Sequence, residues 1–258
     1  MTKRALAAGA IAAALAAGPA AAQPVSGPHE TVENLYTTTQ PGAATGFSFT
    51  GTYHAAGDPS GDPPYMRRMA FYPPPGFRYD TSVPDRCTAS DLELALQGPS
   101  ACPEGSRLGA GTAQGKFMGQ VTTLDVDMFN AENEMVMVAR SPLVASVGRG
   151  RIQPDGSVVW ESPTCYPAVN PPGCPADNVL QMGSAVKQPP YVRNGRSYGT
   201  TPPSCPKSGH WDTAVRFWWA DGSGETVVAP TPCTRPAAKP AKKKRKKKHP
   251  PRRDPAGR

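Results

Sequence analysis

Proline and glycine set the first limit on what this chain can fold into. Proline (32) and glycine (26) together make up more than a fifth of the 258 residues. Proline breaks helix interiors, and glycine weakens helices and strands alike. Leucine, isoleucine, valine and phenylalanine supply only 37 residues. A large helical bundle, a coiled coil and a protein with several membrane-spanning helices are therefore excluded, and one loop-rich β domain with appended segments is expected.

The net charge of +8 is unevenly distributed along the chain. Residues 1–22 carry +2 and residues 236–258 carry +10, which leaves −4 for residues 23–235. The basic pI therefore comes from the C-terminal segment, and the central part is mildly acidic. A dedicated nucleic-acid-binding fold is excluded, because such a fold carries its basic patch on the folded part.

The N-terminus has the three parts of a secretory signal peptide. Lys3 and Arg4 supply positive charge, residues 6–17 are mainly alanine, leucine and isoleucine, and residues 20–22 are small. The alternative, an N-terminal anchor helix, is disfavoured because the apolar stretch is too short and too rich in alanine to span a bilayer well. We expect residues 1–22 to be removed on export, and the mature protein to be extracytoplasmic with no transmembrane segment.

Residues 236–258 are predicted to form a disordered basic tail, because like charges repel and prolines keep the chain extended. Its main basic residues are Lys242, Lys243, Lys244, Arg245, Lys246, Lys247, Lys248, Arg252 and Arg253. On an exported protein such a tail predicts binding to an anionic cell-envelope or extracellular polymer. Each basic residue is worth about 1 kcal/mol near an anionic surface at low salt. The alternative is a solvated tail with no dedicated partner.

The chain has six cysteines, and an even number in an exported protein indicates disulfides. They are Cys87, Cys102, Cys165, Cys174, Cys205 and Cys233. Six cysteines allow fifteen pairings, and the absence of a Cys-x-x-Cys motif disfavours zinc-ribbon and thioredoxin-like sites. Their grouping along the chain favours bonds between neighbours, namely Cys87 with Cys102, Cys165 with Cys174 and Cys205 with Cys233.

One short helix is predicted between the first two cysteines. Ser90 and Glu93 have the spacing of a capping box, in which each side chain binds the other residue's backbone N–H. Leu92 and Leu96 share a face of this helix, and Gly98 followed by proline ends it.

Apolar and polar residues alternate elsewhere, which predicts half-buried strands. The pattern is clearest in residues 47–53, 124–128 and 215–219. Turn-forming residues at 130–133, 154–156 and 221–224 connect strand-like segments.

These patterns predict an all-β fold: a disulfide-linked antiparallel β-sandwich with one short helix and long proline-rich loops. Residues 117–161 are expected to form a β-meander. The predicted organisation is a signal peptide (1–22), an N-terminal extension (23–44), the β-sandwich domain (45–235) and the basic tail (236–258).

One stretch resembles a segment of uncharacterised secreted Cys/Pro-rich β-domain proteins of high-GC Gram-positive bacteria. The resemblance lies in residues 84–87 (PDRC), 98–103 (GPSACP) and 105–113 (GSRLGAGTA). The basic tail is similar to the Lys/Arg-rich ends of some such proteins. The resemblance implies an extracytoplasmic β domain, and it brings no catalytic residue and no known activity.

Catalysis is not expected from this sequence. His249 lies in the tail and His29 near the mature N-terminus, so only His54 and His210 remain as candidate catalytic bases. There is no Gly-x-Ser-x-Gly motif, and the Gly-Ser-Gly at 222–224 is better interpreted as a hairpin turn. The sequence has no metal or phosphate-loop motif, and we expect no cofactor and no metal.

Trp218 and Trp219 are the candidate aromatic contacts for a ligand. They are adjacent on a predicted strand, so their side chains point to opposite faces. One ring is expected in the core. The other is expected to point outward, where it would contact a sugar ring or a protein, or else pack under a loop.

The sequence favours a secreted, non-enzymatic protein that its basic tail tethers to anionic envelope or matrix polymers, or to extracellular nucleic acid. The alternative is a carbohydrate- or protein-binding module with its site on the β domain. A third hypothesis is a hydrolase that uses His54 or His210.

Overall fold

The computed structural model describes residues 23–117, 119–161, 164–165 and 179–235, which form antiparallel strands, one short α-helix and two short 3₁₀ helices. The strands are β1 (Val25–Ser26), β2 (Glu30–Tyr36), β3 (Ala44–Thr45), β4 (Phe47–Tyr53), β5 (Met66–Tyr72), β6 (Arg78–Tyr79), β7 (Arg107–Phe117), β8 (Gln120–Ala131), β9 (Glu134–Arg140), β10 (Ala145–Ile152), β11 (Val158–Glu161), β12 (Thr164–Cys165), β13 (Val179–Gln188), β14 (Val192–Arg193), β15 (Arg196–Ser197), β16 (Gly199–Thr200), β17 (His210–Trp219) and β18 (Gly224–Pro232). The helices are α1 (Asp91–Gln97), η1 (Gly98–Ala101) and η2 (Glu104–Ser106).

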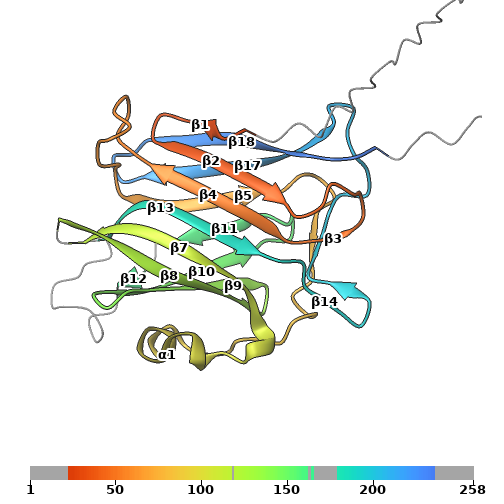
Figure 1. Ribbon diagram of the computed structural model, residues 1–258, viewed down its shortest axis with the longest axis horizontal. Coiled ribbons are helices and arrows are strands. Elements are labelled where there is room, and N and C mark those ends of the chain that lie inside the picture. Colours follow the sequence, from red (N-terminus) through yellow and green to blue (C-terminus); the bar gives the residue numbers. More distant parts are fainter. Residues whose placement is uncertain (1–22, 118, 162–163, 166–178, 236–258) are drawn as a thin grey trace, which may run out of the picture.

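Most of these strands belong to one large antiparallel sheet. Its order is β1-β2-β4-β13-β7-β8-β9-β10-β11-β5-β17-β18, and β12 pairs with β10. The two ends of this order meet, since β18 packs against β1 and β2, so the sheet curls into a nearly closed cylinder. In Figure 1, β2, β4, β13 and β7 form the wall nearer the viewer, and β17, β5 and β11 lie behind it.

The predicted all-β, antiparallel fold is confirmed, and its two facing walls come from one continuous sheet. The three alternating patterns correspond to β4, β8 and β17, and the meander predicted for residues 117–161 is the run β8 to β11. β17 shows why alternating apolar and polar residues predict such strands. Every second residue of β17, from Trp211 to Trp219, is buried inside the cylinder.

Residues 23–44 are part of the domain and not an extension, which corrects the predicted boundary at residue 45. β1 pairs with β2, and β2 pairs with β4 along its whole length, from Glu30 opposite Tyr53 to Tyr36 opposite Phe47. Val32 is fully buried in the main core. β2 is therefore one of the two strands that bring the ends of the sheet together.

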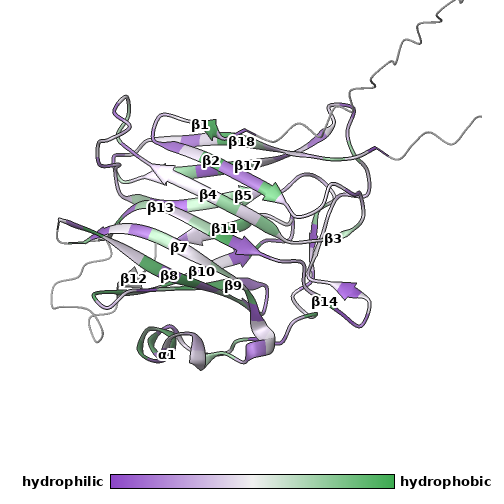
Figure 2. Ribbon diagram, in the orientation of Figure 1, coloured by the Kyte–Doolittle hydropathy of each residue, from purple (hydrophilic) through white to green (hydrophobic). Residues whose placement is uncertain are grey.

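Helix α1 covers the outer face of β9 and β10 and creates a second, smaller core. Ser90 caps the helix and makes the predicted capping box with Glu93. Leu94 and Ala95 are the buried side chains, whereas Leu92 and Leu96, the pair with shared spacing, are about half exposed. Figure 2 shows the hydrophobic stretches of β8 to β10 that face this helix.

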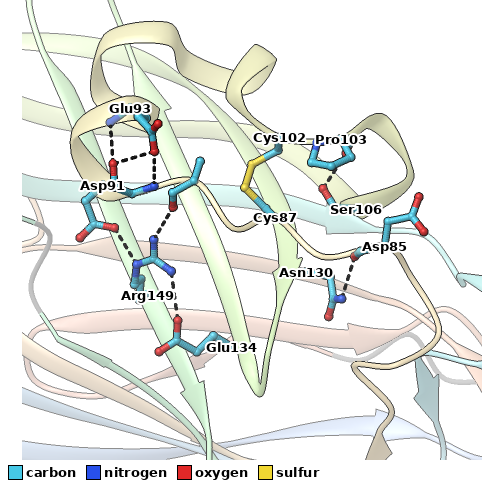
Figure 3. Close-up of a disulfide and its surroundings, with 12 residues drawn as sticks. Asp85, Cys87, Asp91, Glu93, Cys102, Pro103, Ser106, Asn130, Glu134 and Arg149 are labelled. Atoms are coloured by element: carbon cyan, nitrogen blue, oxygen red, sulfur yellow. Dashed lines mark hydrogen bonds and ion pairs between the residues drawn. A yellow bond between two sulfur atoms is a disulfide. The ribbon is translucent and has the colours of Figure 1, made fainter.

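Arg149 on β10 connects the helix to the sheet (Figure 3). Its guanidinium donates to Asp91 Oδ1 (2.6 Å), to Glu134 Oε2 (3.1 Å) and to the carbonyl oxygen of Ala89 (3.0 Å). The side chain is 29% exposed, so these charge-assisted bonds are partly shielded from water.

Two of the three predicted disulfides are confirmed. Cys87 bonds to Cys102 beside α1, and Cys205 bonds to Cys233 near the end of the domain. The third predicted pair involves Cys174 and the side chain of Cys165, which lie outside the described residues. None of the helices in the described ranges is long and apolar enough to cross a membrane.

Candidate functional site

The interior of the cylinder contains two neighbouring chambers, with volumes of about 80 Å³ and 60 Å³. The first is lined by Met66, Arg68, Met69, Ala113, Gln114, Gly115, Leu124, Met137, Ala139, Ser146, Gly148, Trp160, Glu161, Gln181 and Ser184. The second is lined by Asn34, Tyr36, Phe47, Phe49, Met69, Phe71, Pro73, Tyr79, Met128, Met135, Met137, Val158, Trp160, Gln181, Ser184, Val186 and Thr213. Five residues line both: Met69, Met137, Trp160, Gln181 and Ser184. The two chambers are therefore adjacent, and together they are the candidate site, here called the interior cavity.

Two features of the strands explain why this space is left unfilled. A closed sheet of about eight strands has an interior that side chains just fill, and the width grows with strand number. This cylinder has more strands, and several positions that face the first chamber carry small residues, such as Ala113, Ala139, Ser146 and Gly148. A wide circumference with small inward residues leaves room for a ligand.

Methionines form much of the apolar wall. Met66 and Met69 come from β5, Met128 from β8, and Met135 and Met137 from β9. A methionine side chain is unbranched and polarizable, so it adapts its shape to what it contacts. The cavity therefore has an apolar and adaptable lining.

A β-bulge in β13 places two polar side chains at the junction of the chambers. Strand alternation would put residues 181 and 184 on opposite faces, since they are three positions apart. The pairing of β13 with β7 shifts between Gln181 and Gly183, which adds one residue to β13 at this point. Gln181 and Ser184 consequently both line the cavity.

The first chamber communicates with solvent. Ala113, Met137, Ala139, Gln181 and Ser184 line it and are all only partly buried, although they sit inside the sheet.

The charged residues of the first chamber form a pair. Arg68 Nε lies 3.5 Å from Glu161 Oε1, and no other described residue in the lining of this chamber is charged. The Arg68 guanidinium also lies 4.8 Å from the centre of the Trp218 ring.

The two candidate tryptophans lie on opposite faces of β17, as their adjacent positions predict. Trp219 is 2% exposed and stacks on Phe217 in the core, so it is not available as a surface contact. Trp218 is partly exposed, and the guanidinium groups of Arg68 and Arg216 lie over its ring at 4.8 and 4.7 Å. These cations occupy positions over the ring that a stacked sugar would need.

The two candidate catalytic histidines, His54 and His210, have different hydrogen-bond partners. His54 Nδ1 lies 2.9 Å from the carbonyl oxygen of Ala55, and His210 Nδ1 lies 2.8 Å from Asp212 Oδ1. Across the described ranges, neither imidazole is hydrogen-bonded to a serine hydroxyl; Ser208 Oγ bonds to the backbone oxygen of His210.

A buried acidic cluster lies where the two ends of the sheet meet. Glu30 on β2 is fully buried beside Glu225 on β18, and burial, followed by the neighbouring Glu225, raises the pKa of Glu30 to about 8. His29 Nε2 lies 3.6 Å from Glu225 Oε1 and 3.9 Å from Asp221 Oδ2. Trp219 Nε1 donates to Glu225 Oε2 at 3.2 Å.

No group of three or more potential metal-ligating side chains is found in the part of the chain that the structure describes. The predicted tail residues, Lys242 to Lys248, Arg252 and Arg253, lie outside that part. No protein-family model, curated protein or solved structure matches the chain.

Sequence reasoning did not find the interior cavity. Its lining comes from strands spread over most of the chain, from Asn34 to Thr213, and the inward glycines, alanines and methionines have no local signature. The arrangement is suited to holding a small apolar molecule.

Proposed function

We propose that this protein is an exported, non-enzymatic binding protein whose folded part holds a small molecule inside its cylinder. The interior cavity carries the proposal, because two adjacent chambers with an adaptable apolar lining and few polar groups have the character of a ligand site. Among the described residues, neither the His54 nor the His210 imidazole is hydrogen-bonded to a serine hydroxyl, which favours binding over hydrolysis.

Methyl NMR with ¹³C-labelled methionine tests this function, with toluene as the probe. Met69 and Met137 line both chambers, whereas Met182 lines neither. Toluene should shift the methyl signals of Met69 and Met137 in a saturable manner and leave that of Met182 in place. Absence of such shifts at saturating toluene would contradict the proposal.

A matched pair of substitutions locates the binding. Ala139→Leu adds three carbon atoms inside the first chamber and should weaken toluene binding at least about tenfold. Ala185→Leu adds the same atoms to an exposed position on β13 and should leave binding unchanged. Equal effects of the two variants would place toluene outside the cavity.

We further propose that the basic tail retains the exported protein on an anionic envelope or extracellular polymer. This second proposal is supported by the division of charge, +10 in residues 236–258 against −4 in residues 23–235. Two disulfides in the folded part fit an oxidising compartment such as the cell exterior.

Retention on isolated cell envelopes tests the tail. The mature protein should bind at low salt and be released at high salt, and a chain ending at Arg235 should not bind. A full-length variant with residues 242–248 replaced by glutamine keeps the length of the tail but removes most of its charge, and it should also fail to bind. If the shortened chain binds as well as the full-length chain, the tail is not the anchor. The variant Trp218→Ala then tests whether the outer face of β17 is the part that binds the envelope.

A further inference from the structure

The size of the two chambers limits the ligand. Taken together, their volumes of about 80 Å³ and 60 Å³ come close to that of an apolar cavity of ~150 Å³ that takes up benzene in another protein. A molecule of about one ring that occupies both chambers matches this space.

The lining of the second chamber disfavours a charged ligand. None of its described lining residues is charged, and the charged pair of the first chamber, Arg68 and Glu161, has side chains that are 43% and 69% exposed. An ion placed in the second chamber would lose its hydration without gaining a charged partner among these residues, which is strongly unfavourable. The ligand is therefore expected to be neutral.

The polar groups of the cavity divide into two sets. At the far end of the second chamber, Thr213 Oγ1 already bonds to the Tyr36 hydroxyl (3.0 Å) and to Asn34 Nδ2 (3.4 Å). At the junction of the chambers, the Gln181 amide has no hydrogen-bond partner among the described residues, and the Ser184 hydroxyl lies beside Tyr53. Because a polar group inside an apolar site gains from a partner, the junction is where a ligand's own polar group would bind.

We infer, on the basis of the proposed binding function, that the ligand is a neutral, mainly apolar molecule of about one ring that carries a hydroxyl or carbonyl group, held by Gln181 and Ser184. The apolar part lies against Met69, Met137 and Trp160, and the polar group lies at the bulge of β13. The bulge provides the specificity of the site, because it turns both polar side chains toward the same junction.

Three probes of similar size test the inference by methionine-methyl NMR titration at pH 7, where the phenol remains neutral. They are toluene, 4-methylphenol and benzoate. The hydroxyl of 4-methylphenol should make it bind roughly five- to tenfold more tightly than toluene. Benzoate should cause no shift at Met69 or Met137, because its carboxylate carries a charge.

Two variants test whether the preference for 4-methylphenol over toluene comes from Gln181 and Ser184 at the junction of the chambers. Ser184→Ala and Gln181→Leu should each bring the affinity for 4-methylphenol close to that for toluene, while toluene still binds. Thr50→Ala removes a hydroxyl from an exposed position on β4 that lines neither chamber, and it should keep the wild-type ratio of the two affinities. Comparable methyl spectra of the unliganded variants establish that each one is folded.

The outcomes separate the inference from the proposed function. If toluene binds but 4-methylphenol binds no better, or if Ser184→Ala and Gln181→Leu keep the wild-type ratio, the assigned ligand class is wrong and the binding function stands. Binding of benzoate as tight as that of toluene also overturns the ligand class. If none of the three probes shifts Met69 or Met137, the binding function itself is wrong.

Discussion

The indole ring of Trp160 lies flat against the backbone of Gly150 on the neighbouring strand. The two residues are paired in register between β11 and β10. A Cβ atom at Gly150 would be 2.3 Å from Trp160 Cε2, far closer than two carbon atoms can approach. The glycine therefore fixes the position of a ring that lines both chambers of the interior cavity.

Gly150→Ala is expected to lower the free energy of unfolding by about 1–3 kcal/mol, because the added methyl group must displace the Trp160 ring. Gly148→Ala is the matched control, since its Cβ would lie 3.6 Å from the same ring, at ordinary contact distance. Urea denaturation measures both. Equal stability of the two variants would mean that the ring moves aside without cost.

The buried Glu30 should make the free energy of unfolding fall as the pH rises. Its pKa is about 8 in the folded protein against an ordinary value of 4.5, so the folded state holds a proton that the unfolded state releases. Stability attributable to this group is therefore complete below pH 4.5 and falls between pH 4.5 and about 8, by at most roughly 1.4 kcal/mol per pH unit.

Glu30→Gln tests this dependence, because glutamine is uncharged in both states. Urea midpoints at pH 5 and pH 8 should show a smaller decline for the variant than for the wild-type protein. Glu33→Gln makes the same charge change on the outer face of β2 and should keep the wild-type decline. A Glu30→Gln protein that declines as steeply as wild type would show that Glu30 ionises normally in the fold.

Arg149→Met is expected to destabilise the attachment of α1 to the sheet. The substitution removes the bonds to Asp91, Glu134 and Ala89, and we expect a loss of about 1–3 kcal/mol in the free energy of unfolding. Arg151→Met is the control, because Arg151 is 74% exposed and lies 3.7 Å from Glu134, so its loss should stay below about 1 kcal/mol. Calorimetric unfolding of both variants compares them, and a larger effect of Arg151 would contradict the assignment.

Removal of either described disulfide should cost several kcal/mol. The bonds close sequence separations of 15 and 28 residues, for which the chain-entropy relation gives about 3 kcal/mol and slightly more. The paired alanine variants at Cys87 and Cys102, and at Cys205 and Cys233, can be compared by urea denaturation. A cost below about 1 kcal/mol for the first pair would mean that Arg149 and the second core hold α1 without the bond.

Features that depend on neighbouring residues were predictable from the sequence. The capping box of Ser90 and Glu93 formed as expected because both residues lie within one turn of helix. The strands of the meander followed from alternation and from turn residues such as Asn133, which adopts a positive φ of 54° between β8 and β9. Cysteines that are close in sequence form disulfides with each other because short loops close at low entropic cost.

Features that depend on how distant strands meet were not predictable. The sequence marks Leu92 and Leu96 as an apolar pair, yet packing against β10 selects Leu94 and Ala95 for burial. Residues 23–44 carry only a weak strand pattern. The strand β2 forms because it pairs with β4 on one side and packs against β18 on the other.

The sequence by itself determined the class of the fold, the short helix, the neighbouring disulfides and the separation of an acidic domain from a basic tail, since each depends on local spacing or on composition. The tertiary structure alone decided the cavity, the buried Glu30 and the junction of Gln181 and Ser184. Closure of the sheet brings β2 against β18, and one extra residue in β13 turns two polar side chains to the same face. Both depend on long-range pairing register, which composition and periodicity do not specify.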